Sequence, residues 1–153
     1  MLNVQTIPPA PRWLGFAGLL PQLACLAVVL FGPVEWSWTA YAIAWAYAAL
    51  IFSFLGGTWW GLAAAGMARG EAVASPLWLA AVFPSLLALA TFTPWIVGAR
   101  WPGPSLIVLG CAILLSPLVD WHLRRMAPPW WMPLRLMLSA GLGAATLAIA
   151  FAR

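Results

Sequence analysis

The sequence predicts an all-α integral membrane protein, a bundle of five transmembrane helices joined by short loops. Hydrophobic residues make up 65% of the chain and charged residues 7%, and the mean hydropathy is +0.97. A soluble domain carries roughly 25% charged residues. Seven basic and three acidic side chains are too few to cover a globule of 153 residues. Most of its surface must therefore face lipid.

Five apolar stretches have the length that a membrane span needs, about 20 residues. The sequence Gly32-Pro33 closes the first stretch. Pro76, Pro104 and Pro133 mark the starts of the third, fourth and fifth, because the missing N–H of proline costs nothing in a first helical turn. Within a single domain of residues 1–153, we expect spans at about residues 13–31, 38–68, 77–97, 104–123 and 134–151.

The second stretch is too long for a single upright span. Residues 36–68 carry no charge, and as one helix they would measure about 50 Å, against a hydrocarbon core of about 30 Å. A break at Gly56-Gly57 is one solution, because glycine tolerates unusual backbone angles. Gly57 and Gly61 form a GxxxG pair, which favours close helix packing instead. We expect a continuous or mildly bent helix packed through Gly57 and Gly61, with Gly56→Ala tolerated.

The same segment supplies the best candidate for a pocket. Trp59 and Trp60 stand next to glycines, where aromatic walls and exposed backbone could meet. The predicted packing or pocket residues are Ser53, Gly56, Gly57, Thr58, Trp59, Trp60 and Gly61.

The arginines predict the orientation of the bundle. With five spans, Arg12, Arg69, Arg124, Arg125 and Arg135 belong to the side of the N-terminus, and Arg100 and Arg153 to the other side. The positive-inside rule then places the N-terminus in the cytoplasm, or in a mitochondrial matrix, and the C-terminus outside. We expect a bacterial inner membrane. The arginines are spread over short connections, so they predict topology and not a nucleic-acid surface.

The ionisable residues exclude several classes of function. All acids and arginines lie at expected span ends, which argues against a proton pathway through the bundle. His122 is the single histidine, too few for a zinc or bis-histidine haem site, and we expect no cofactor. Asp120 and His122 are two residues apart, so a helix points them to different faces. We expect no enzyme activity.

The stretch DWHLRRMAPPWWMPLR, residues 120–135, predicts a basic and aromatic collar. Asp120 and Arg124 can pair along a helix, Trp121 and Arg125 can form a cation–π contact, and Arg135 can extend to the surface. Anchoring at the interface is the preferred interpretation, with an anionic lipid headgroup as the alternative. The predicted interface or headgroup contacts are Asp120, Arg124, Arg125, Trp130, Trp131 and Arg135.

Three segments resemble one family: SFLGGTWWGLA, VFPSLLALA and LVDWHLRRMAPPWWMPLRLML. It is the domain-of-unknown-function family of small inner-membrane proteins that includes mitochondrial transmembrane protein 69. The matching residues are Ser53, Phe54, Leu55, Gly56, Gly57, Trp60 and Gly61, then Pro84 and Ser85, then Asp120, Pro129, Trp131, Leu134 and Arg135. Trp131 stands where the family has tyrosine, and residues 121–123 separate the family's Asp-Arg. The resemblance implies a five-span membrane protein and brings no established activity.

Two functions remain open. The first is a non-enzymatic accessory, assembly or interaction protein of a larger membrane complex. The alternative is a binder of a lipid or small apolar ligand of the tetrapyrrole, sterol or quinone class, with its pocket near the Gly-Gly-Thr-Trp-Trp segment. The chain is similar to the translocator protein family in span number and tryptophan content, which is architectural analogy alone. The expected partners are the lipid bilayer and, as alternatives, other membrane proteins or anionic lipids, but not nucleic acid.

Overall fold

The computed structural model describes residues 7–152; the N-terminal residues 1–6 and Arg153 lie outside the described part. The described chain folds into helices and contains no strand. The helices in chain order are α1 (Pro9–Ala17), α2 (Leu20–Phe31), α3 (Val34–Ala68), α4 (Ser75–Ala90), α5 (Thr93–Ile96), α6 (Gly103–Leu115), α7 (Pro117–Leu123) and α8 (Trp131–Phe151).

These helices form five segments that are long and apolar enough to cross a membrane: Pro9–Phe31, Val34–Ala68, Ser75–Ile96, Gly103–Leu123 and Trp131–Phe151. Large apolar side chains such as Phe31, Leu79 and Phe151 stay exposed on the outside of the bundle, where lipid would solvate them. The chain is thus a multi-pass membrane protein, and the predicted fold class, an all-α bundle of five spanning helices, is confirmed.

Three of the five segments are interrupted near a proline. Breaks separate α1 from α2, α4 from α5 and α6 from α7, just before Pro21, Pro94 and Pro117. Proline lacks the N–H that an interior helical turn needs, and its ring crowds the preceding turn. Pro84 also lies inside a helix, α4, which continues through it. The breaks matter for the site, because each frees backbone carbonyls that side chains must satisfy.

Helix α3 runs unbroken through the glycine segment, as expected, but a different glycine makes the close contact. A Cβ on Gly56 would lie 2.3 Å from the carbonyl oxygen of Ala81 in α4. Gly57 and Gly61 are exposed, and a Cβ on either would meet nothing within 4 Å. The prediction that Gly57 and Gly61 pack while Gly56 tolerates a side chain was therefore wrong. The pattern gave the spacing of a packing face but not which neighbour α3 would meet.

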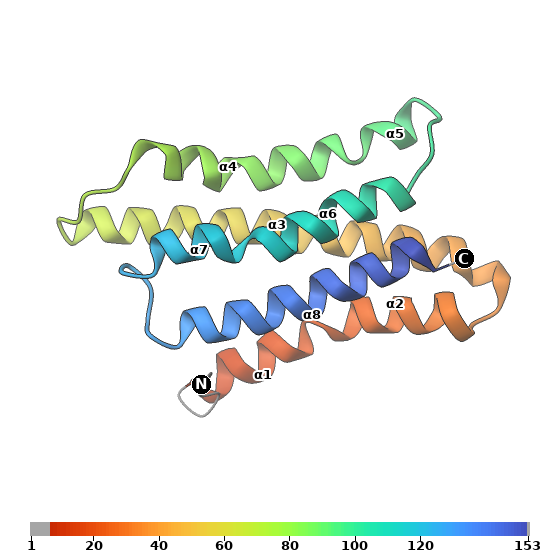
Figure 1. Cartoon of the computed structure of the whole chain (residues 1–153), viewed down its shortest axis with the longest axis horizontal. Helices are drawn as coiled ribbons and strands as arrows, with labels where there is room; N and C mark the ends of the chain where they lie inside the picture. The colour runs from red at the N-terminus through yellow and green to blue at the C-terminus, as the bar shows by residue number, and fades with distance from the viewer. Residues whose placement is uncertain (1–6, 153) are drawn as a thin grey trace.

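The helices run roughly side by side, with α3 packed against α4 on one flank and against α2 and α6 on the other. Figure 1 shows that the N-terminal end of α1, the α3–α4 loop and the α7–α8 loop share one end of the bundle. A bond from Arg69 Nη2 to the carbonyl oxygen of Met126 joins two of these segments, over 3.3 Å. We call this the arginine-rich end, because Arg12, Arg69 and Arg124 all belong to it.

Candidate functional site

A buried ion pair lies near the arginine-rich end of the bundle. Asp120 in α7 is completely buried, and Arg135 in α8 is 5% exposed. Arg135 Nε donates to Asp120 Oδ2 over 2.9 Å. The indole N–H groups of Trp59 and Trp131 donate to Asp120 Oδ1 over 2.9 and 3.1 Å. A buried carboxylate needs such donors, and here they come from α3 and α8, so one side chain of α7 ties three helices together.

A serine at the α6–α7 break extends this network. Pro117 cannot donate to the Ile113 carbonyl one turn earlier, and Ser116 Oγ donates there over 2.7 Å. Ser116 Oγ also accepts a bond from Arg135 Nη2 over 3.0 Å. Because its one proton serves Ile113, the 3.1 Å contact with Ser139 Oγ must have Ser139 as the donor. Each hydrogen bond of the network therefore has an assigned donor and acceptor, and the proton of Ser139 is used within the network.

The guanidinium of Arg135 has N–H groups that bond to no acceptor in residues 7–152, and we call them its reserve donors. An arginine has five N–H groups, and the bonds to Asp120 and Ser116 use two of them. Nη1 has no acceptor anywhere in residues 7–152. In a membrane bundle, an unsatisfied donor of this kind is costly unless something else accepts its bond.

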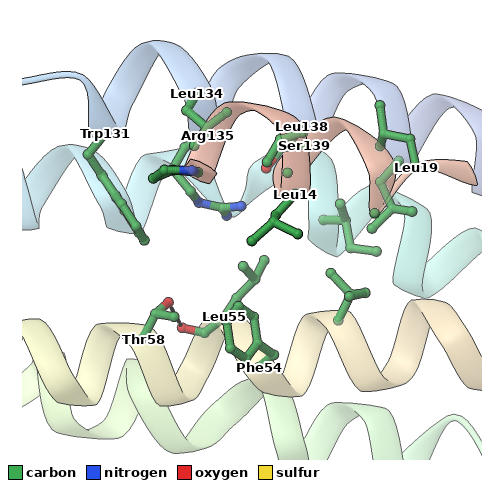
Figure 2. A pocket seen from close by; sticks show the side chains of 16 residues that line it. Leu14, Leu19, Phe54, Leu55, Thr58, Trp131, Leu134, Arg135, Leu138 and Ser139 are labelled. Atoms are coloured by element: carbon green, nitrogen blue, oxygen red, sulfur yellow. Dashed lines mark hydrogen bonds between the residues drawn. The ribbon is translucent and has the colours of Figure 1, made fainter. Parts of the chain in front are cut away.

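The reserve donors border a cavity of about 370 Å³ between α1, α3 and α8. Figure 2 shows Arg135 and Ser139 on one side of it and Leu55 and Thr58 on the other. The lining residues are Pro11, Leu14, Gly15, Gly18, Leu19, Ile51, Phe54, Leu55, Thr58, Ile113, Trp131, Leu134, Arg135, Leu138, Ser139 and Leu142. Within this described lining, Arg135 is the only charged residue.

The cavity opens to the outside of the bundle. Leu14 of α1 and Phe54 of α3 line it and are 74% and 65% exposed. Both side chains belong to segments long and apolar enough to span a membrane, where exposed apolar side chains face lipid, so we infer that the opening faces the bilayer. An apolar molecule could enter sideways from the membrane.

The structure corrects the interpretation of Asp120 and Arg135 as interface anchors. Both are buried inside the bundle, and Asp120 pairs with Arg135 rather than with Arg124. Arg124 instead donates to the carbonyl of Trp121 over 2.8 Å, and its guanidinium lies 4.0 Å from the centroid of that ring. Arg125 was expected to make this cation–π contact. Arg124, Arg125 and Trp121 are exposed at the arginine-rich end.

The tryptophan pair beside the glycines does not form the wall of the cavity, which corrects the second site prediction. Trp59 points to Asp120, and Trp60 is 49% exposed and packs edge-on against Trp78, with 4.7 Å between ring centroids. Thr58 is the residue of that predicted group that reaches the cavity. Ser53 is half-buried and does not line it.

The sequence contained one signal that pointed to the pair. Asp120 lies in the last turn of one span, and Arg135 in the second turn of the next. Two spans joined by a short loop run antiparallel, so these positions fall at the same depth. An acid and a base at matched depth in adjacent spans are expected to pair inside the bundle and not to face headgroups.

Comparison with known proteins places the chain in a family without giving it a role. No curated protein and no solved structure matches it. The family model described as "Protein of unknown function (DUF3429)" matches residues 7–151. The match includes every helix of the bundle and both members of the Asp120–Arg135 pair. The chain therefore belongs to the DUF3429 family.

Proposed function

We propose that this protein holds a lipid or another small apolar molecule in the cavity between α1, α3 and α8, without chemical turnover. The observation that carries the proposal is the pairing of an apolar cavity with the reserve donors of Arg135. Binding sites for small molecules are typically concave and mostly apolar, with volumes of roughly 300–1,000 Å³ and a few convergent polar groups. The volume of about 370 Å³ lies at the lower end of that range.

The position of the cavity supports a ligand that comes from the bilayer. Protein interiors are close-packed, and voids much larger than a water molecule are few. A space of this size beside lipid would be filled by an acyl chain or a similar apolar group. The exposed rim at Leu14 and Phe54 supplies the route.

Filling the cavity with protein atoms tests the proposal. Thr58 lines the cavity, and its hydroxyl bonds only to the Leu55 carbonyl of its own helix, so Thr58→Phe adds a ring to the space with little other change. Ser85→Phe adds the same ring at an exposed position of α4 and serves as the matched control. Native mass spectrometry of the protein released from mild detergent should detect a retained apolar molecule in the parent and the control.

Thr58→Phe should lose most of that retained mass. If the parent keeps no apolar molecule beyond detergent, or if Thr58→Phe and Ser85→Phe keep it equally, the cavity is not the binding site. Circular dichroism of all three proteins shows whether the bundle is intact, so a folding defect is recognised separately.

A second candidate function is interaction with another membrane protein. Gly57 and Gly61 form a GxxxG pair on the outside of α3 with open space above both, and such pairs favour close contact with a second helix in lipid. Native electrophoresis from the protein's own membranes should show a complex that Gly61→Leu dissolves and Ser85→Leu leaves intact. Migration of the parent as a single subunit would remove this candidate.

We also propose a bacterial inner membrane with the N-terminus in the cytoplasm. The support is that the N-terminal end of α1, the α3–α4 loop and the α7–α8 loop share one end of the bundle, and these segments carry Arg12, Arg69, Arg124 and Arg125. Alkaline phosphatase is active only outside the cytoplasm, so a fusion after residue 152 should be active and a fusion in the α3–α4 loop inactive. The reverse pattern would invert the orientation.

The segment resemblance supports extending the family to mitochondrial transmembrane protein 69, which a sequence profile built from family members would test.

A further inference from the structure

We propose that the molecule held in the cavity carries an uncharged carbonyl oxygen, which accepts hydrogen bonds from Arg135. This inference rests on the proposed function, because it assumes that the cavity binds a ligand. It adds the chemistry of the group that the protein recognises. Three features of the site carry it: the free donors, the charge balance and the depth.

The free donors require an acceptor. Arg135 is only 5% exposed. After its bonds to Asp120 and Ser116, three of its five N–H groups have no acceptor. Neither polar hydroxyl of the lining, Thr58 or Ser139, accepts a bond from Arg135. Thr58 Oγ1 stands on the opposite wall, bonded to Leu55, and no other acceptor in residues 7–152 bonds to Nη1. A ligand oxygen in the cavity would satisfy donors that the chain leaves open.

The charge balance favours an uncharged acceptor. Asp120 and Arg135 form a neutral pair, and the described lining contains no further cation. An anionic ligand would bring a second negative charge beside Asp120 in an apolar environment, where an uncompensated charge is strongly unfavourable. A carbonyl oxygen accepts the same hydrogen bonds and leaves the pair neutral.

The depth of Arg135 fits the same group. Helix α8 has 21 residues, about 31 Å at 1.5 Å per residue, which matches a hydrocarbon core of about 30 Å. Arg135 is the fifth residue of α8, so it lies about 6 Å along the axis from the first residue. An ester of a glycerolipid or the ring of a membrane quinone can place a carbonyl at this level, with its chain in the apolar part of the cavity.

A series of probes with one shared chain length tests the inference. Hexadecane has no acceptor, methyl palmitate has an uncharged carbonyl, and palmitate has an anionic one. Each is added at the same mole fraction to protein in mild detergent, and native mass spectrometry measures the fraction of protein that carries it. We expect the occupancy ratio to favour methyl palmitate over hexadecane by about tenfold, the effect of a hydrogen bond to a charged donor, and over palmitate as well.

A double variant removes the donors without leaving a buried charge. Asp120→Asn combined with Arg135→Met is neutral and keeps an oxygen at residue 120 for the indoles of Trp59 and Trp131. Within this variant, the occupancy ratio of methyl palmitate to hexadecane should fall to about one, because the donors that favour the carbonyl are gone. If this variant fails to fold by circular dichroism, the probe series on the parent still decides the question.

The outcomes separate this inference from the proposed function. Equal binding of hexadecane and methyl palmitate by the parent would overturn the inference and leave the apolar binder standing. Stronger binding of palmitate than of methyl palmitate would overturn the proposal that the carbonyl is uncharged. Binding of no probe would remove the proposed function, and the inference with it. Where methyl palmitate is preferred, a hexadecyl benzoquinone and dipalmitoylglycerol, compared in the same way, identify which source of carbonyl the cavity accepts.

Discussion

Trp59 at the arginine-rich end of the bundle and Trp101 at the other end use their indole N–H groups in opposite ways. At the arginine-rich end, Trp59 and Trp131 act as hydrogen-bond donors, and both indoles point at one carboxylate, Asp120. At the other end, Trp101 is packed among rings, and its Nε1 is buried without a partner among the described residues. The ring centroids around it are those of Trp95 at 5.2 Å, Trp45 at 5.3 Å, Trp38 at 5.7 Å and Phe92 at 6.3 Å.

This difference shows which interactions stabilise each end of the bundle. The arginine-rich end depends on a few directional bonds to buried charges, whose loss leaves a charge without compensation. At the other end, Trp101 depends on many ring contacts of about 0.5–1.5 kcal/mol each beyond burial, and its own N–H makes no bond among the described residues. Substitutions of the same kind should therefore have larger effects at the arginine-rich end, and the reserve donors of Arg135 exist only there.

The largest effect is expected for Arg135→Ala. Removing one partner of a buried ion pair leaves the other unpaired, which costs about 3–5 kcal/mol of unfolding free energy. Asp120 would keep the two indole donors and lose its cation. Unfolding by SDS in mixed micelles, followed by circular dichroism, measures the change. The double variant Asp120→Asn with Arg135→Met should lose far less, and an equal loss in both variants would mean that packing, not charge, holds this end.

The next effect compares the two classes of tryptophan directly. Trp59→Phe removes a bond to a charged acceptor and should cost about 1.5–3 kcal/mol. Trp101→Phe removes ring area but also removes a buried N–H that has no partner, and these changes offset each other, so we expect less than about 1 kcal/mol. The same SDS titration ranks them. A larger loss for Trp101→Phe would reverse the comparison between the two ends.

Sequence composition was sufficient for the fold because lipid imposes one dominant rule, that apolar residues cover a helix about 20 residues long. It was insufficient for the site because a residue's depth does not say which way it faces. Asp120 and Arg135 were placed at the correct level, near span ends, but were assigned to the surface rather than to each other. The choice depends on how α7 and α8 are rotated about their axes, which the position of a residue along its span does not give.

The prediction for the glycine segment was wrong for a related reason. Gly56, Gly57 and Gly61 all suit close packing by type, and a spacing rule selected Gly57 and Gly61. The neighbour that decides is the α4 backbone at Ala81, which belongs to another span and leaves no trace in the local pattern. Proline positions were more informative for helix starts, because their effect lies within one helix.

A substitution midway between the ends checks that the comparison is not a general fragility of the bundle. Gly56→Ala places a methyl group 2.3 Å from the Ala81 carbonyl oxygen and should cost about 1–3 kcal/mol through overpacking. Gly57→Ala meets open space and should be neutral or slightly stabilising, since alanine favours helix over glycine by about 1 kcal/mol. The two midpoints in an SDS titration should differ in that order. Equal midpoints would show that α4 moves aside without cost.

The smallest effect compares two serines that serve similar backbone roles at opposite ends. Ser105 Oγ donates to the Thr91 carbonyl over 2.6 Å beside the α4–α5 break, as Ser116 does to Ile113 at the α6–α7 break. Ser105→Ala removes one neutral bond and should cost about 1 kcal/mol. Ser116→Ala also removes the acceptor of Arg135 Nη2 and should cost about twice as much, because bonds to charged groups are roughly twice as strong.

Ser85→Ala, at an exposed position of α4, gives the baseline for both serines in the same titration. Equal losses for Ser105→Ala and Ser116→Ala would show that the bond to Ser116 contributes nothing to holding Arg135. In that case the guanidinium could turn toward the cavity with a fourth free donor. The preference for methyl palmitate over hexadecane should then be the same in Ser116→Ala as in the parent. If Ser116 instead holds the guanidinium in place, Ser116→Ala should lose part of that preference.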